Sequence, residues 1–177
     1  MSEGPSIIEN TLEFENCTIY LSNEYSTELN FDYKNITKKT VKELLNTLKC
    51  PKAESFELSM KLSDNDTVQQ LNKQYRGKDY PTNVLSFEED LDDQFADFMD
   101  EDEPTYIGDI IFAVPVVLQQ AQEQNKPVEE HFAHLVAHSI LHVFGFDHID
   151  EHEAQVMEDL EIKILQRLQI ANPYIER

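Results

Sequence analysis

The chain has 177 residues, 40% of them hydrophobic and 28% charged, and its formal net charge is −21. These values suit one globular domain with a real core, and they exclude a wholly disordered or collagen-like chain. A field of this sign repels nucleic acids at long range, so any RNA-binding or DNA-binding function needs a locally basic site. Two cysteines, Cys17 and Cys50, are too few for a disulfide framework. With neither a secretory leader before Lys34 nor an apolar run long enough to span a membrane, we expect a soluble, cytoplasmic protein.

The periodicity of apolar residues predicts an α+β fold of about four strands and about five helices. Residues 1–10 are expected to be a loose leader, and residues 11–177 a single domain. Strands are expected where apolar residues alternate, within 11–21 and at 56–62, 83–87 and 106–113. Helices are expected at 37–48, from a capping box of Ser63 and Asp66 to Gly77, at 115–124, at 127–144, and from a cap of Asp150 and Glu153 to Leu168.

One segment, Glu88 to Glu103 (residues 88–103), differs in composition because it holds ten acidic residues and no basic one. Blocks of like charge are usually solvated and unstructured. We therefore expect a mobile acidic connection between two strands, which metal binding does not require. A regulatory or partner-binding loop is the alternative interpretation.

All six histidines lie between residues 131 and 152, and three of them have the spacing of metal ligands. His138 and His142 are four residues apart in a helical pattern, so both imidazoles project from one face. Gly145 ends that helix and lets the chain turn back, which can bring His148 to the same point. Three nitrogen donors arranged in this way are typical of a catalytic zinc site with one open coordination position. The pattern predicts one zinc ion per chain.

The remaining histidines are expected to have other roles. His131 lies about 10 Å from His138 along a straight helix, which is too far to share one ion. We interpret His134 as a core residue or a neighbour of the ligands, and His152 as a surface residue. The ligand spacing also matches zinc proteases, but Ser139 occupies the place of their catalytic glutamate. A serine hydroxyl does not ionise near neutral pH, so a peptidase is disfavoured.

Three motifs together resemble the YbeY family, the bacterial rRNA maturation endoribonucleases. The first runs from Leu71 to Phe87 and includes Tyr-Arg-Gly-Lys at 75–78 and Pro-Thr-Asn-Val-Leu-Ser-Phe at 81–87. The second is Gly-Asp-Ile at 108–110, and the third is the histidine segment through His148. The resemblance covers most of the chain, about residues 56–176 apart from the acidic segment.

The resemblance implies a zincin-like, metal-dependent hydrolase with zinc on His138, His142 and His148. It also implies a single-strand-specific endoribonuclease that acts on small-subunit (16S) rRNA, especially at its 3′ end, and in ribosome quality control. The expected partners are therefore rRNA and the small ribosomal subunit, without a membrane or DNA. Arg76 matches a functionally important arginine of the family. Ser139 stands where the family commonly has glycine, and Glu88 where it commonly has proline.

Residue chemistry suggests further roles around the site. We expect Arg76 to be catalytic together with His138, because a guanidinium can hold a phosphodiester through two hydrogen bonds. Lys73 and Lys78 are candidates for RNA binding, although basic residues also favour helix C-termini. Two carboxylates could orient a ligand imidazole, namely Asp109 and Asp147. Asp109 could equally cap a turn.

Two alternatives to a zinc endoribonuclease stay open at this point. One is a zinc hydrolase of another substrate class, such as a peptidase or amidase. The other is a ribosome-assembly factor whose zinc is mainly structural. The sequence also leaves open whether a hydroxide or the 2′-hydroxyl of the RNA attacks phosphorus.

Overall fold

The computed structural model describes residues 7–49, 55–89, 103–147 and 149–175. Three features of the sequence lie outside this part of the chain, namely Cys50, His148 and nearly all of the acidic segment. The expectation of a mobile acidic loop therefore remains a prediction. Within the described ranges the chain forms a mixed five-stranded sheet and five helices, in agreement with the expected α+β fold.

The strand order across the sheet is β1-β2-β3-β5-β4. The three central strands, β2, β3 and β5, run parallel to one another, and the edge strands β1 and β4 are antiparallel to their neighbours. The bounds of the strands are β1 Ile8–Glu13, β2 Cys17–Asn23, β3 Phe56–Ser63, β4 Val84–Glu88 and β5 Thr105–Ala113.

The N-terminal region differs from the sequence expectation. Residues 8–10, expected to belong to the leader, pair with β2, so the sheet has five strands rather than about four. The two apolar alternations within 11–21 belong to two strands of a hairpin. The amide of Phe14 donates to the carbonyl of Cys17 at 2.7 Å and closes the turn between them. Alternation alone shows that a segment is extended, but it does not show where the chain reverses.

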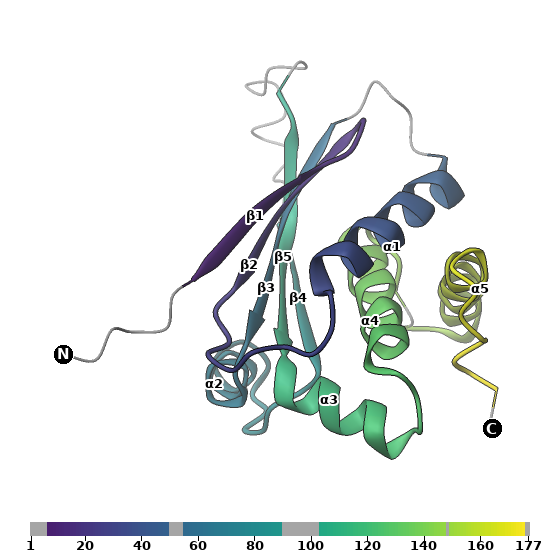
Figure 1. Ribbon diagram of the computed structural model, residues 1–177. Helices are drawn as coiled ribbons and strands as arrows, with labels where there is room; N and C mark the ends of the chain where they lie inside the picture. Colours follow the sequence, from purple (N-terminus) through teal and green to yellow (C-terminus); the bar gives the residue numbers. More distant parts are fainter. Residues whose placement is uncertain (1–6, 50–54, 90–102, 148, 176–177) are drawn as a thin grey trace.

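The helices lie on both faces of this sheet (Figure 1). On one face α1 and α4 pack against the strands, and α5 packs on these two helices, whereas α2 covers β4 and β5 on the other face. None of the helices in the described ranges is long and apolar enough to cross a lipid bilayer. The bounds of the helices are α1 Tyr33–Leu48, α2 Asn65–Arg76, α3 Val114–Glu123, α4 Val128–Val143 and α5 Glu151–Arg167.

Helix ends follow local capping chemistry, with two corrections to the sequence analysis. The predicted capping box of Ser63 and Asp66 is wrong, because Ser63 is still part of β3. Asp64 caps α2 instead, and its side chain accepts from the amide of Thr67 at 2.8 Å. Helix α1 begins at Tyr33 rather than at Thr37, since the side chain of Asp32 caps it earlier.

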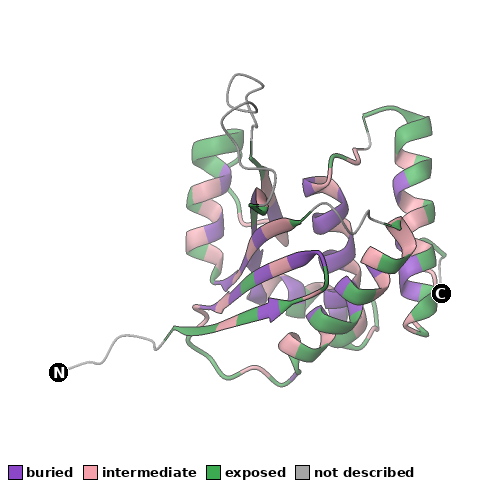
Figure 2. Ribbon diagram, turned by 90° about the horizontal axis from the view of Figure 1, so that it is seen from above, coloured by how far each residue is buried: buried purple, intermediate pink, exposed green. Residues whose placement is uncertain are grey.

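The core lies between the inner face of the sheet and helices α1 and α4. Seen from above, buried residues line the strands and the inward sides of the helices (Figure 2). Phe132 of α4 meets the rings of Phe31 and Phe112, with centroids 5.4 and 5.1 Å away. Gly108 of β5 lies close to both β4 and α4. A Cβ at this position would clash with the carbonyl of Phe87 and lie 3.0 Å from Val143, so glycine lets these elements pack together.

Candidate active site

Helix α4 places two of the predicted metal ligands side by side. The helix begins directly after Pro127, and most of its residues are buried in the core. His138 and His142 are only half-buried, and their ring centroids are 5.6 Å apart at an interplanar angle of 78°. Both rings line a pocket of about 230 Å³ between α4, the end of α2 and β4. The spacing of four residues therefore brings both imidazoles to one cavity, as predicted.

The end of α4 is a Schellman motif built on Gly145. The amide of Gly145 donates to the carbonyl of His142 at 3.0 Å, and that of Phe146 to the carbonyl of Leu141 at 3.0 Å. Gly145 has φ of 104°, which glycine adopts without strain. Helix α4 thus ends at Val143, one residue after His142. The third predicted ligand, His148, lies outside the described residues.

Arg76 forms the opposite wall of the pocket, at the last position of α2. Gly77 closes the helix with a left-handed φ of 69°, as the sequence predicts. The Nη2 of Arg76 donates to the carbonyl oxygen of Ser86 in β4 at 2.8 Å. Its guanidinium also lies over the ring of Phe87, 5.7 Å from the centroid. These contacts hold the side chain across the edge of β4.

The segment between α2 and β4 adds polar groups to this wall. Lys78, Tyr80 and Thr82 line the same pocket. Asn72, which is 2% exposed, donates from Nδ2 to the carbonyl of Tyr80 at 2.8 Å and fixes the segment to α2. Lys73 is not among the residues that line the pocket; its Nζ lies 3.7 Å from Asp79 on the surface. Of the two lysines predicted to bind RNA, the structure thus brings only Lys78 to the histidines.

A buried carboxylate beside His138 is one that sequence reasoning missed. Glu161 of α5 is 1% exposed, and its Oε1 lies 3.1 Å from Nδ1 of His138 and 2.8 Å from Nε2 of His134. Its Oε2 accepts from the hydroxyl of Tyr174 at 2.9 Å. A signal was available, because Glu161 interrupts the apolar stripe of α5, four residues after Met157.

The environment of Glu161 determines its charge. Burial opposes ionisation, but hydrogen bonds from His134 and His138 outweigh this and lower the pKa of Glu161 to about 2. An ionised carboxylate only accepts hydrogen bonds, so Nδ1 of His138 carries the proton. In neutral His138 the lone pair then lies on Nε2, at the other side of the ring. This is the nitrogen that a metal ion would use.

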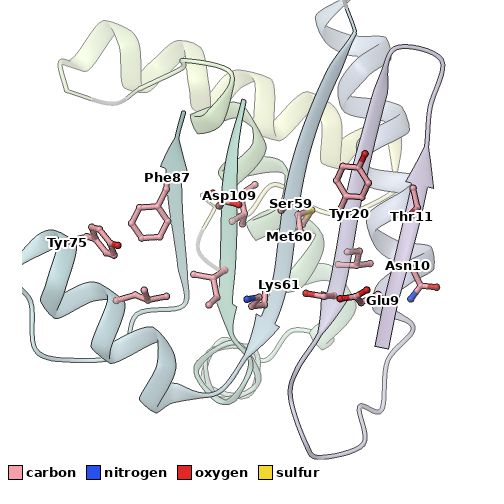
Figure 3. A pocket seen from close by; sticks show the side chains of 15 residues that line it. Glu9, Asn10, Thr11, Tyr20, Ser59, Met60, Lys61, Tyr75, Phe87 and Asp109 are labelled. Carbon is pink, nitrogen blue, oxygen red and sulfur yellow. The ribbon is translucent and has the colours of Figure 1, made fainter. Parts of the chain in front are cut away.

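Asp109 lies on the opposite face of the sheet from the histidines, so it does not have the predicted role of orienting a ligand. It is in register with Ser59 and Phe87 on the neighbouring strands, and side chains in register share a face. Its Oδ1 accepts a hydrogen bond from the hydroxyl of Tyr106. Figure 3 shows Asp109 with Ser59 and Phe87 on this face, which is hollowed by a larger cavity of about 630 Å³. That cavity has no histidine among its lining residues.

The other predicted positions are placed as follows. Asp147 is half-buried directly after the α4 turn, and it has contacts of its own, so its predicted role stays a prediction. His131 is 4% exposed, and its Nε2 lies 2.9 Å from Oε1 of Gln120, away from the pocket. Ser139 is fully buried and donates to the carbonyl of Val136. The residue at the position of the protease glutamate thus faces the core.

The donor set fits a zinc ion as far as it is described. His138 and His142 supply imidazole nitrogens at one cavity, and Oε1 of Glu161 lies 3.1 Å from Nδ1 of His138. Among the described residues no group of three metal-binding side chains occurs, and the third predicted donor, His148, is not one of them. The two described histidines match the pattern of a site that a third histidine would complete.

Known proteins resemble this chain over most of its length. A model of the family described as Endoribonuclease YbeY matches residues 20–169. A protein named Endoribonuclease YbeY from Colwellia psychrerythraea is 51% identical over 124 residues, which are 70% of this chain and 76% of that protein. A protein of the same name from Francisella tularensis subsp. holarctica is 46% identical over 121 residues, 68% of this chain and 73% of that protein.

A solved structure has the same fold. The solution structure of TM1509 from Thermotoga maritima aligns with a TM-score of 0.52 and 23% sequence identity, covering 86% of this chain and 91% of that one. This likeness confirms the mixed α+β architecture. The family match confirms the resemblance on which the sequence analysis relied.

Proposed function

This chain belongs to the Endoribonuclease YbeY family, and we propose that it is a zinc-dependent endoribonuclease acting on single-stranded RNA. The observation that carries this proposal is one pocket that contains His138 and His142 on one wall and Arg76 and Lys78 on the other. Imidazoles suit a metal ion, and a guanidinium and an ammonium suit a phosphate. A pocket that combines the two fits a phosphodiester.

We assign the metal to His138, His142 and His148. A zinc ion held there would supply Lewis acidity, by polarising a phosphoryl oxygen or by lowering the pKa of a bound water. The protein's own contribution is to present two imidazoles from one helix at one pocket.

Arg76 is the residue best placed to hold the scissile phosphate. A guanidinium has five N–H donors, so its hydrogen bond to the carbonyl of Ser86 leaves others for a phosphate. That bond and the contact with Phe87 also limit the rotation of the side chain. Fixed donors of this kind offset charge that develops on the phosphoryl oxygens in the transition state.

The net charge of −21 means that RNA binding requires a locally basic site, and Arg76 and Lys78 supply one. A strongly acidic protein repels RNA from most of its surface, so binding should be confined to the pocket that carries Arg76 and Lys78. In keeping with the family, the proposed substrate is small-subunit rRNA near its 3′ end. The proposed setting is ribosome maturation and quality control in the cytoplasm.

Cleavage of an rRNA 3′-end fragment by the zinc-loaded protein tests this function. The wild type should cleave the fragment, and His142→Ala should neither cleave it nor retain stoichiometric zinc. A protein that holds zinc and is folded but leaves the fragment intact would contradict the proposal. It would favour an assembly factor with a structural metal.

Arg76→Ala provides the sharper prediction. Loss of the phosphate contact should lower the single-turnover cleavage rate by about 10²–10³-fold, while zinc content stays unchanged. Arg76→Lys should recover part of the rate, since an ammonium lacks the planar fork. Thermal unfolding is the control, because Arg76 also bonds to Ser86. Unchanged cleavage by a folded Arg76→Ala protein would remove Arg76 from the reaction.

A further inference from the structure

A carboxylate buried between α4, α5 and the C-terminal segment has no part in the proposed chemistry so far. Glu161 is 1% exposed, although glutamate is rarely buried unless it is paired. Its position on α5 is flanked by the buried side chains of Met157, Ile164 and Leu165. An apolar residue would satisfy the same helix face without the cost of desolvating a charge. The carboxylate therefore calls for an explanation beyond packing.

The contacts of Glu161 divide between its two oxygens. Oε2 accepts from the hydroxyl of Tyr174, which follows α5 in the C-terminal segment. Oε1 faces the side chains of His134 and His138, one turn apart on α4, at 2.8 and 3.1 Å. The hydroxyl of Tyr174 thus holds one oxygen, and the rotation of the carboxylate is restricted. Its other oxygen then presents a fixed acceptor to Nδ1 of His138.

We propose that Glu161 and Tyr174 are positioning residues that orient the imidazole of His138 for metal binding, an inference that rests on the metal site proposed above. The carboxylate fixes the tautomer and the ring plane of His138, so that Nε2 faces the pocket. Tyr174 acts one step further away, by holding the carboxylate. His134 supplies a second hydrogen bond to Oε1, the oxygen that also faces His138, and this bond stabilises the negative charge of Glu161. A hydrogen-bond partner of this kind also raises the basicity of the ligand nitrogen.

The C-terminal segment is thereby linked to the active site. Tyr174 lies 36 residues after His138 in the chain, and its ring meets that of His134 edge to face, with centroids 5.5 Å apart. The amide of Tyr174 donates to the side chain of Asn172 at 2.9 Å, which fixes the turn that carries it. Substitutions in this segment should therefore change metal binding, although the segment does not contact the metal.

The test measures metal binding rather than RNA cleavage. Metal-free wild type and variants are titrated with Co²⁺ against a competing chelator, and the visible absorption of bound Co²⁺ reports the ligand geometry. Glu161→Gln keeps the size of the side chain and removes its charge, whereas Tyr174→Phe removes one hydroxyl and keeps the ring. Asp159→Asn is the matched control, because Asp159 is an exposed carboxylate on the same helix that accepts from Gln155.

Glu161→Gln should weaken Co²⁺ binding about 10- to 100-fold and change the absorption bands. Tyr174→Phe should weaken Co²⁺ binding by a smaller factor and change the absorption bands less. Asp159→Asn should match the wild type in both measurements. A folded Glu161→Gln protein with wild-type affinity and bands would overturn the inference and leave Glu161 a purely structural residue. If that variant does not fold, wild-type affinity and bands in Tyr174→Phe overturn the inference instead.

The same measurements separate this inference from the proposed function. A wild-type protein that takes up no Co²⁺ would remove the metal site and this inference with it. Weakened binding in Glu161→Gln, in a protein that cleaves no RNA, would support the inference and count only against the nuclease function.

Discussion

Two histidines of α4 show how the surroundings of a residue decide its chemistry. His131 and His138 are two turns apart on the same helix. His131 is buried beside Gln120, and burial, together with positive charge on His134 and Lys126, lowers the pKa of His131 to about 4. His138 lies at a pocket and meets the carboxylate of Glu161. The same side chain therefore serves as a neutral core residue in one place and as a proposed metal ligand in the other.

His131 should make the protein less stable in mild acid. In the unfolded chain this histidine takes up a proton near pH 6.5, whereas in the folded chain it does so only near pH 4. Stability is therefore complete above pH 6.5 and falls as the pH drops from 6.5 towards 4. We expect His131 to account for a loss of about 1–2 kcal/mol between pH 7 and pH 5.

Denaturant unfolding of the metal-free protein at both pH values measures this loss. His131→Gln retains a donor for Gln120 but has no titrating group, so its stability should fall less over the same interval. Equal losses in the wild type and the variant would show that His131 does not titrate as described. Chelator is present throughout, since protonation of metal ligands would otherwise contribute.

At the scale of elements, the segment from α2 to β4 forms one wall of the pocket. It carries Lys78, Tyr80 and Thr82 without regular secondary structure, and side-chain hydrogen bonds hold it together with a backbone bond from the amide of Lys78 to the carbonyl of Asn72 at 3.2 Å. Asn72 supplies a buried one, to the carbonyl of Tyr80, and Gln69 supplies more exposed ones to Asp79. Side chains of α2 therefore position the segment that follows the helix and forms this wall.

Asn72→Ala should loosen this wall. The change leaves the carbonyl of Tyr80 without its donor in a part-buried place, which should cost about 1–3 kcal/mol of stability. Cleavage of RNA should also slow, because Lys78 lies on the released segment. Gln69→Ala is the control at a more exposed position and should cost less. If both variants unfold at the same denaturant concentration, burial of the Asn72 contact is not what holds the segment.

At the scale of the whole molecule, the sheet separates two cavities of different chemistry. The inner face carries α4 and the histidine pocket, and the outer face carries Asp109 and the larger cavity. The size of a cavity does not identify the candidate site here, because the groups proposed to bind a metal ion and a phosphate line the smaller one. A metal ion at that pocket would bind a helix that packs against α1, α3, α5 and the sheet.

Zinc should therefore stabilise the whole fold. A ligand that binds only the folded state at 100 times its dissociation constant adds about 2.7 kcal/mol to the free energy of unfolding. Thermal unfolding with and without zinc should show this increase in the wild type. His142→Ala should lose the response, and His152→Ala, an exposed residue, should keep it. A full response in His142→Ala would remove His142 from the ligand set.

Local features of this protein could be predicted from its sequence. The five helices of the described ranges were all predicted, some from apolar residues at helical spacing and others from a proline at the start, and Gly77 and Asp150 ended or capped helices as expected. His138 and His142 were placed together because four residues make one turn of a helix. Each of these predictions depends on residues a few positions apart, and over such distances the backbone geometry alone decides what lies together.

Only the tertiary structure showed which residues surround the site. Glu161 reaches His138 across 23 positions of sequence, and Tyr174 reaches Glu161 across 13, through the packing of α5 and the C-terminal segment on α4. Asp109 lies on the outer face because the register of β5 with its neighbours turns it away from the histidines. Contacts of this kind depend on which faces of distant elements bury each other, and that choice is made by the whole core rather than by any local pattern.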